Sequence, residues 1–391
     1  MLTTRKTVVR LAALVAVGAL LLAACGDDDN SSSKDKAASA KGVKCPNIAF
    51  AFFGALTGPN ANLGINERNG MKVALKDWND ANPNCKVDLK EFDSQGSADQ
   101  APALAQQAIQ DEKIVAMVGP AFSGESRTAN PILDQGGLPL ITASATGVDL
   151  STKGWKVFHR GVGNDNAQGP AIASYLTKEL NAKRVAVLDD KSEYGKGIAD
   201  IVRSKLGAAD VVNDSFDDKA TEFSSTVNKL KAANIDAVVF GGYYAQAGPL
   251  AKQLKDGGVK ATFVGPDGVN DMGFVKGAGD AAEGAVLTAP AAPLETITGS
   301  QQFKDAYRAI NGTDTGLYSA EAYDATNVFL ECVKQGKVTR SDINACLSTI
   351  SFQGLTKNYK WDANGELAGQ VTVYAYRVDN GEIKGVAPIS A

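Results

Sequence analysis

The fold class of this chain follows from residues 184–240, RVAVLDDKSEYGKGIADIVRSKLGAADVVNDSFDDKATEFSSTVNKLKAANIDAVVF. Short apolar runs alternate here with longer amphipathic segments. The apolar runs are 184–188, 211–216 and 237–240, and the amphipathic segments are 196–206 and 221–233. Apolar strands joined by amphipathic helices lie parallel in a sheet that helices cover on both faces. The stretch therefore predicts an α/β fold with a doubly wound, Rossmann-like parallel sheet.

The same alternation continues on both sides of this stretch. Before it, strands are predicted at 47–53, 86–92, 114–118, 138–142 and 157–160, and helices at 66–78, 99–110, 125–134 and 168–180. After it, helices are predicted at 246–255, 301–310, 319–334 and 340–347, and strands at 262–264 and 285–288. Two last strands, near 356–361 and 371–377, can return to either half of the chain.

These strands are too many for one open sheet of ordinary size, which holds roughly four to six. A break near 161–166 divides them evenly. We therefore predict two lobes joined by several crossings, which would form a hinge with a cleft between the lobes. The N-terminal lobe is predicted over 45–165 plus about 289–365, and the C-terminal lobe over 166–288 plus about 366–391.

The N-terminus has the features of a secretory signal. Three basic residues, Arg5, Lys6 and Arg10, precede an uncharged apolar run at 11–24. This run is shorter than the roughly 20 residues that span a bilayer. We predict a cleavable signal peptide over residues 1–24.

The apolar run ends in Leu-Ala-Ala-Cys, residues 22–25, which resembles a bacterial lipobox. Cleavage at such a motif leaves an acylated cysteine as the first residue. Residues 25–43 have no apolar pattern from which a core could be built. We therefore predict lipidation of Cys25, a disordered tether over 25–43, and anchoring at the extracytoplasmic face of the bacterial cell membrane. A simple cleavage site followed by a chance cysteine is the alternative.

The remaining chain is mildly acidic. Removing three basic residues and no acid from 40 Lys+Arg and 44 Asp+Glu leaves 37 against 44, a formal net charge of −7. A net negative charge gives no sign of the basic surface with which proteins bind nucleic acid. The single histidine, His159, excludes an HExxH site, and neither a Walker A loop nor a GxSxG elbow occurs. Asp93 and Asp165 are loop acids that could form a general acid–base pair, but such acids more often cap helices. We expect no metal, no cofactor and no catalysis.

Four cysteines remain beside Cys25, and in an oxidising compartment they can pair in three ways. Cys45 and Cys85 each precede one of the first two strands, and neighbouring parallel strands begin at the same end of a sheet. Cys332 and Cys346 lie on consecutive predicted helices joined by a short turn. We predict the disulfides Cys45–Cys85 and Cys332–Cys346.

The loops after the strands are where doubly wound sheets bind ligands, because helix N-termini there offer free N–H groups. Ser123 and Thr146 lie on two such loops and can hold a carboxylate. Asp267, on a loop of the second half, can hold an ammonium group together with a backbone carbonyl of residues 143–146. These groups predict a site for a zwitterion.

Two tyrosines on the loops of the second half, Tyr194 and Tyr243, can cover an apolar side chain while their hydroxyls stay hydrogen-bonded. Each candidate residue has an ordinary structural alternative, because serines and threonines cap helices and acids occupy turns. Their convergence on the predicted cleft favours binding.

Six stretches between residues 54 and 270 connect this chain, from about residue 47 to residue 377, with a known family. They are GALTGPNAN at 54–62, ITASATGVDL at 141–150, RGVGNDNAQGP at 160–170, DDKSEYGKG at 189–197, NIDAVVFGGY at 234–243 and VGPDGVN at 264–270. In this order they resemble the leucine/isoleucine/valine-binding proteins of ABC importers. The resemblance implies the type I periplasmic-binding fold, in which two lobes joined by three crossings close on one solute without catalysis.

The resemblance also implies a role for each candidate residue. Ser123 and Thr146 would bind the ligand carboxylate, Ser144 would supply a backbone carbonyl with Ala145 beside it, and Asp267 would bind the amino group. The implied side-chain pocket is lined by Tyr194, Tyr243, Tyr318 and Leu63. Two of these positions depart from the best-known members, which carry a glutamate in place of Asp267 and an aromatic residue in place of Leu63. Gly96 and Phe122 stand where those members have cysteines.

The implied ligand is a small amino acid, with leucine, isoleucine or valine favoured, and the departures leave an amide or an aromatic amino acid as alternatives. The implied partners are an ABC importer permease and its ATPase, and the protein is expected to be a monomer. A ligand-sensing receptor subunit of the same fold is the alternative role, and it would need a partner for signalling.

Overall fold

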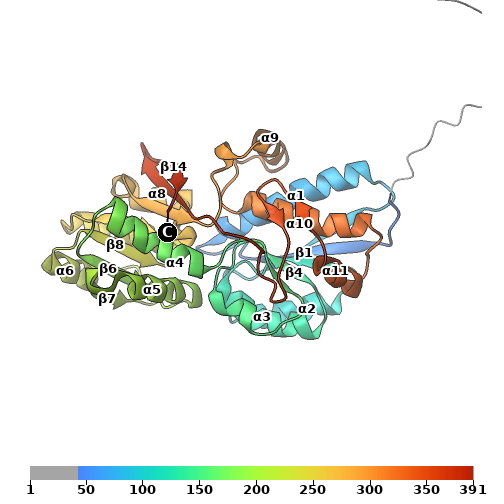
Figure 1. Cartoon of the computed structure of the whole chain (residues 1–391), viewed down its shortest axis with the longest axis horizontal. Coiled ribbons are helices and arrows are strands. Elements are labelled where there is room, and N and C mark those ends of the chain that lie inside the picture. Colours follow the sequence, from blue (N-terminus) through green and yellow to red (C-terminus); the bar gives the residue numbers. More distant parts are fainter. Residues whose placement is uncertain (1–42, 391) are drawn as a thin grey trace, which may run out of the picture. The chain divides into compact units, whose positions relative to one another are not determined.

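The computed structural model describes residues 43–390 (Figure 1). The predicted signal peptide, Cys25 and the predicted tether up to residue 42 lie outside the described residues. Two large β-sheets, called here sheet A and sheet B, divide the helices between them. Among residues 43–390, no helix combines the length and the apolar character needed to cross a membrane.

Sheet A holds five parallel strands in the order β2-β1-β3-β4-β5. They are β1 (Ile48–Gly54), β2 (Val87–Asp93), β3 (Ile114–Val118), β4 (Leu140–Thr142) and β5 (Phe158–Arg160). Its helices are α1 (Ala61–Ala81), α2 (Ala101–Gln110), α3 (Ser123–Gln135), α9 (Ser300–Asn311), α10 (Ser319–Lys334) and α11 (Arg340–Leu347). Every residue of β1 is buried because alternate side chains enter two cores. Phe50 shares one core with Phe329 of α10, and Phe53 shares the other with Leu133 of α3.

Sheet B has the strand order β14-β13-β10-β9-β8-β6-β7. Its strands are β6 (Val185–Asp189), β7 (Asp210–Ser215), β8 (Ala237–Gly241), β9 (Thr262–Gly265), β10 (Val286–Ala289), β13 (Tyr374–Asp379) and β14 (Glu382–Pro388). Its helices are α4 (Asp165–Ser174), α5 (Glu193–Leu206), α6 (Ser224–Ala233), α7 (Tyr244–Asp256) and α8 (Met272–Ala278). The two faces of β6 again enter different cores, Val187 with Val202 of α5 and Leu188 with Leu250 of α7.

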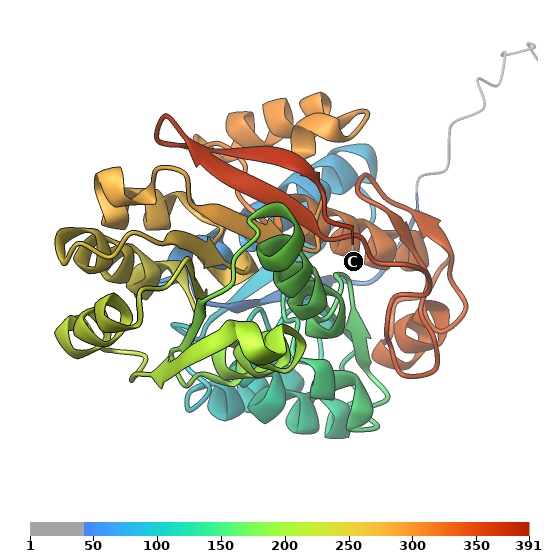
Figure 2. The ribbon, with the colours of Figure 1, turned by 60° about the vertical axis from the view of Figure 1, so that its left-hand side comes forward.

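The chain passes between the sheets three times, after β5, after β10 and before β13. The destination of the last two predicted strands, which the sequence left open, is now clear. The 371–377 run becomes β13, which pairs antiparallel with β10 and forms the long red hairpin with β14 in Figure 2. The 356–361 run contains β12 (Asn358–Tyr359), which instead pairs with β11 (Phe352–Gln353). The predicted lobe boundaries themselves stay a prediction.

Several helices begin earlier than their apolar pattern indicates. The helix predicted at 66–78 begins at Ala61, and the one predicted at 196–206 begins at Glu193. These first turns are polar or Gly-rich, so periodicity does not reveal them. The helix predicted at 168–180 begins at Asp165 and passes into a π-helical turn at Tyr175–Glu179. As a result, several predicted loop residues lie on the first turns of helices.

Both expected disulfides are present in the structure. Cys45 and Cys85 are 4.7 Å apart between Cα atoms, and Cys332 and Cys346 are 6.1 Å apart. The first bond joins the segments that enter β1 and β2, which are neighbours in sheet A. The second joins α10 to α11 across their short connection. Both predicted cysteine pairings are therefore confirmed.

Candidate functional site

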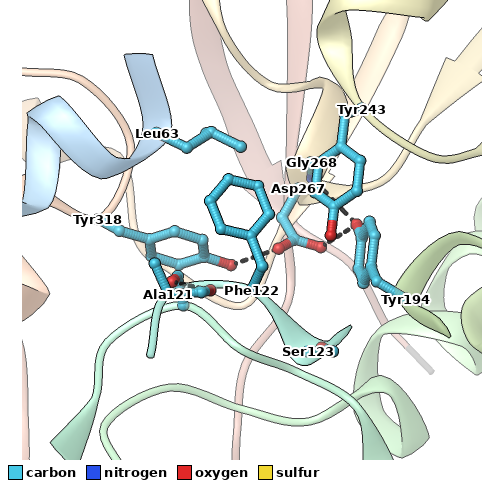
Figure 3. A pocket seen from close by; sticks show the side chains of 10 residues that line it. Leu63, Ala121, Phe122, Ser123, Tyr194, Tyr243, Asp267, Gly268 and Tyr318 are labelled. Carbon is cyan, nitrogen blue, oxygen red and sulfur yellow. Dashed lines mark hydrogen bonds between the residues drawn. The ribbon is translucent and has the colours of Figure 1, made fainter. Parts of the chain in front are cut away.

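A pocket lies where side chains of the sheet A part meet those of the sheet B part (Figure 3). Its volume, including the space at its open mouth, is about 300 Å³. Seven predicted residues line it: Leu63, Ser123, Ser144, Tyr194, Tyr243, Asp267 and Tyr318. Three others line it as well: Ala121, Phe122 and Gly268.

The buried carboxylate of Asp267 lies at the middle of this pocket (Figure 3). Asp267 begins a 3₁₀ turn, η4 (Asp267–Val269), just after β9. Its Oδ1 accepts a hydrogen bond from the Tyr194 hydroxyl at 2.6 Å, and its Oδ2 accepts one from the Tyr318 hydroxyl at 2.9 Å. Burial raises the pKa of Asp267, and these hydrogen bonds oppose the rise. Tyr194 belongs to α5 and Tyr318 precedes α10, so one carboxylate connects the parts built on the two sheets.

The backbone at two of the lining residues is unusual. Tyr318 has a φ of 65°, a left-handed conformation that is costly for a bulky residue and therefore depends on surrounding contacts. Gly268 approaches its neighbours closely, because a Cβ atom there would lie 2.7 Å from the Gly242 carbonyl oxygen and from Cε1 of Tyr194. The Gly268 N–H donates to the Tyr194 hydroxyl at 3.0 Å. The site therefore requires glycine after Asp267.

Aromatic rings form one wall of the pocket. The Phe122 and Tyr243 ring centroids are 5.2 Å apart, and those of Tyr194 and Tyr243 are 5.1 Å apart. Leu63, in the first turn of α1, faces this wall from the other side (Figure 3). Phe122 is not among the binding residues predicted from the sequence. Its position beside Ser123, on a loop that follows a predicted strand, could have identified it as a lining residue.

The N-terminus of α3 forms the polar side of the pocket. Ser123 is the first residue of α3, and its Oγ accepts a hydrogen bond from the Gly147 N–H at 3.1 Å. The Ser144 hydroxyl donates to the Ala121 carbonyl at 2.6 Å. The first N–H groups of a helix have no partner inside the helix, and the helix dipole there favours an anion. This end of the pocket therefore suits a carboxylate.

Comparison with known proteins identifies the family of this chain. The sequence profile of the family described as periplasmic binding protein matches residues 47–382. The leucine-, isoleucine-, valine-, threonine- and alanine-binding protein of Pseudomonas aeruginosa is 32% identical over 339 residues, which cover 85% of this chain and 90% of that protein. The Leu/Ile/Val-binding protein of Escherichia coli is 30% identical over 83% of this chain and 89% of that protein. This chain belongs to the periplasmic binding protein family.

A solved structure supports the same assignment. It is that of the branched-chain amino acid transporter substrate-binding protein LivJ from Streptococcus pneumoniae in complex with isoleucine. It matches with a TM-score of 0.81 and 28% sequence identity, and the match covers 88% of this chain and 100% of that chain. This periplasmic binding protein therefore falls among the substrate-binding proteins of branched-chain amino acid ABC transporters and has the type I fold that the sequence predicts.

Two of the predicted ligand residues of this periplasmic binding protein, Ala145 and Thr146, are not among the residues that line the pocket. Both are buried. The Ala145 carbonyl accepts a hydrogen bond from Arg160 Nη1, and the Gly147 carbonyl accepts one from Arg160 Nη2 at 2.9 Å. These bonds draw the loop toward β5. The Thr146 hydroxyl has no hydrogen-bond partner among residues 43–390.

Further contacts join the two parts of the periplasmic binding protein around the pocket. The Asn62 side chain donates to Asp271 Oδ1 at 2.8 Å, and the Asn62 N–H donates to the Tyr244 hydroxyl at 3.1 Å. Arg127 of α3 forms an ion pair with Glu193 of α5. In the part of the chain that the structure describes, no group of three or more His, Cys, Asp or Glu side chains is placed to hold a metal ion.

Proposed function

We propose that this protein captures a small aliphatic L-amino acid in the pocket, with leucine, isoleucine or valine favoured, and delivers it to an ABC importer. The observation that carries the proposal is the pairing of the buried Asp267 carboxylate with the α3 N-terminus across one pocket. A carboxylate acceptor at one end and N–H donors at the other match the ammonium and carboxylate groups of an amino acid. The ligands named for the relatives and for the LivJ complex support the same ligand class.

The roles of the lining residues follow from this arrangement. Ser123, Thr146 and the first N–H groups of α3 hold the ligand carboxylate. A backbone carbonyl of the adjacent loop, at Ser144 beside Ala145, accepts a hydrogen bond from the ammonium group. Asp267 accepts hydrogen bonds from the ammonium group. The apolar side chain lies among Leu63, Phe122, Tyr194, Tyr243 and Tyr318.

Binding without catalysis is the proposed activity, and the partners are a permease and its ATPase. We take the two parts to be lobes with the boundaries predicted from the sequence. These lobes would rotate about the three crossings when the ligand binds. We propose further that the mature chain is a monomer anchored by lipid at Cys25 outside the cell membrane.

Calorimetry with the mature protein tests the ligand class. Leucine, isoleucine or valine should bind with one site per chain, whereas phenylalanine and an amide such as acetamide should bind weakly or not at all. Binding of only phenylalanine or an amide would contradict the aliphatic assignment. The shorter reach of Asp267, compared with the glutamate of the best-known members, is the observation that favours such a different solute.

Uptake by cells separates transport from sensing. Deleting the gene for this protein should abolish uptake of the bound amino acid if the protein serves an importer. Unchanged uptake with a lost response to the same amino acid would favour the receptor role instead.

A further inference from the structure

The side chain of Arg160, the last residue of β5, is fully buried and binds two separate parts of the chain. Its Nε and Nη2 donate to the Glu366 carboxylate at 3.1 Å and 2.9 Å. Its Nη1 donates to the Ala145 carbonyl, and Nη2 also donates to the Gly147 carbonyl at 2.9 Å. Because the guanidinium has both a counter-charge and carbonyl acceptors, its burial is compensated. Arg160 therefore connects the last crossing with the loop at 145–147.

The last crossing packs tightly against β5, which fixes the place of Arg160. The Arg160 N–H donates to the Gly365 carbonyl at 2.8 Å. Gly365 has a φ of 75°, and a Cβ atom there would lie 2.0 Å from the Phe158 carbonyl oxygen, so no other residue fits. Asn164 of the first crossing donates to Glu366 Oε1 at 3.2 Å. The Glu366 carboxylate is thus held from two crossings.

The loop at 145–147 has three successive carbonyl groups that are all bound by residues around the first crossing. The first and third accept hydrogen bonds from the Arg160 guanidinium, and the second accepts one from the Asp165 N–H at 3.0 Å. Asp165 is the first residue of α4. The C=O and N–H groups of one planar trans peptide point in opposite directions. The Gly147 N–H, which shares a peptide with the Thr146 carbonyl, is therefore directed away from α4.

The Gly147 N–H makes a contact with the ligand pocket. It donates to Ser123 Oγ at 3.1 Å, and Ser123 lines the pocket. A Cβ atom at Gly147 would lie 3.2 Å from the same oxygen, so the loop and the start of α3 are in close contact. A serine hydroxyl that accepts a hydrogen bond keeps its own proton to donate. The Ser123 proton can therefore be directed at a ligand carboxylate.

We propose that Arg160 is a positioning residue for the carboxylate group of the ligand. Through the loop at 145–147 it holds the Gly147 N–H in place, and this N–H fixes the orientation of the Ser123 hydroxyl. Glu366 in turn holds the guanidinium at the last crossing. This inference rests on the proposed function and extends it to residues outside the pocket lining. Because Arg160 and Glu366 together carry no net charge, they act on the ligand through the hydrogen bonds of the loop.

Arg160→Lys keeps the positive charge but loses the planar fork of donors that reaches both the loop and Glu366. Calorimetry should show leucine binding about five- to tenfold more weakly, a part of what a hydrogen bond to a charged group contributes. In a Ser123→Ala chain the same substitution should cost less than about twofold more, because the hydroxyl that Arg160 positions is already absent. Additive losses would overturn the inference and leave the proposed function intact.

Arg340→Lys is the matched control, because the Arg340 guanidinium also binds backbone carbonyl groups. It donates to the Ile114 carbonyl at 2.8 Å and to the Ile109 carbonyl at 3.0 Å. Ile114 begins β3, whereas the pocket follows the carboxyl ends of the strands. Arg340→Lys should lower the melting temperature but keep leucine affinity within about twofold of the wild type. Equal losses of affinity in Arg160→Lys and Arg340→Lys would contradict a positioning role.

Hydrogen exchange of the ligand-free protein gives a readout that does not depend on leucine. Peptides covering 143–150 should exchange at least about tenfold faster in Arg160→Lys than in the wild type, while peptides of β6 stay unchanged. Glu366→Gln, which loses the counter-charge but keeps an acceptor, should show the same change to a smaller extent. It replaces Arg160→Lys in the affinity measurements if that variant does not fold.

The two measurements separate this inference from the proposed function. If leucine fails to bind but exchange at 143–150 is accelerated, the aliphatic assignment falls and the positioning role of Arg160 stands. Unchanged exchange at 143–150 in both Arg160→Lys and Glu366→Gln would overturn the positioning role, whatever the ligand.

Discussion

Arg160 and Glu366 form a buried ion pair, with 2.9 Å between Nη2 of Arg160 and Oε1 of Glu366. Arg160 ends β5 just before the first crossing, and Glu366 lies in the last crossing, before β13. The same guanidinium donates to the carbonyl groups of Ala145 and Gly147. One side chain therefore holds together two connections between the sheets and the loop beside the ligand pocket.

Removing Glu366 should destabilise the protein strongly. Glu366→Ala leaves the fully buried Arg160 without its counter-charge, which should lower the free energy of unfolding by about 3 kcal/mol. This is the lower end of the usual range because 20% of the Glu366 side chain is exposed. Urea denaturation measures the loss. Arg308→Ala, which breaks the exposed pair with Asp314, is the control and should cost less than about 1 kcal/mol. Equal losses in the two variants would show that the buried pair has no special role.

Ligand affinity should depend more on Asp267 than on Leu63. Asp267→Ala leaves the ligand ammonium buried without a carboxylate and should weaken leucine binding by about 2–5 kcal/mol. Leu63→Ala removes apolar contact and should cost no more than about 1.5–3 kcal/mol. Calorimetry with leucine gives both values, and circular dichroism confirms that each variant is folded. A larger effect at Leu63 would show that apolar contact, not charge, dominates recognition.

The two disulfides should contribute unequally to stability. In the chain-entropy model, the Cys45–Cys85 disulfide closes a loop with a sequence separation of 40 and should raise the free energy of unfolding by about 4 kcal/mol. The loop closed by Cys332–Cys346, with a separation of 14, is worth about 3 kcal/mol. Denaturation of the two double-serine variants should therefore show the larger loss for the first pair. The reverse order would mean that native-state packing at α10 and α11 outweighs loop length.

Stability should fall as the pH rises from about 5 to about 8, in part because of Glu67. Burial raises the pKa of Glu67 from 4.5 to about 8. In this range the folded protein keeps a proton that the unfolded chain loses, so the free energy of unfolding decreases by up to about 1.4 kcal/mol per pH unit. Glu67→Gln should make this slope shallower in denaturation series across the range. Glu222→Gln, at an exposed position, should leave it unchanged. Parallel curves for wild type and Glu67→Gln would contradict the prediction.

Membrane attachment should depend on Cys25. Cys25→Ala removes the proposed acylation site, so the protein should move from the membrane fraction to the soluble extracytoplasmic fraction, because stable anchoring needs lipid chains. Immunoblots of the two fractions detect the change, and Ser32→Ala in the predicted tether serves as the control. An unmodified Cys25 in the mass spectrum of the native protein would rule out the anchor.

The parallel strands and most helices could be predicted because their signals are local. The first four residues of β6, 185–188, are all apolar, which indicates burial on both faces of the sheet, and α10 keeps one helical periodicity from Ser319 to Lys334. The hairpin strand β14 and the seven-residue α8 give little signal. Side chains of β14 are mostly exposed, and α8 is too short for a clear period.

The loops that carry Ser123, Tyr194, Tyr243 and Asp267 could also be predicted, because ligand loops follow the carboxyl ends of parallel strands. By itself, the sequence thus determined the fold class, the pairing of the cysteines and the segments that meet at the pocket.

The tertiary structure alone decided which side chains of those segments face the pocket. Phe122 and Gly268 enter the lining, whereas Ala145 and Thr146 do not line the pocket, and the Ala145 carbonyl accepts a hydrogen bond from Arg160 of β5. It also buried Asp165, a residue that reads as a helix cap, in the first turn of α4. The physical reason is that these orientations depend on hydrogen bonds and packing between residues far apart in the chain, and no local period records such contacts.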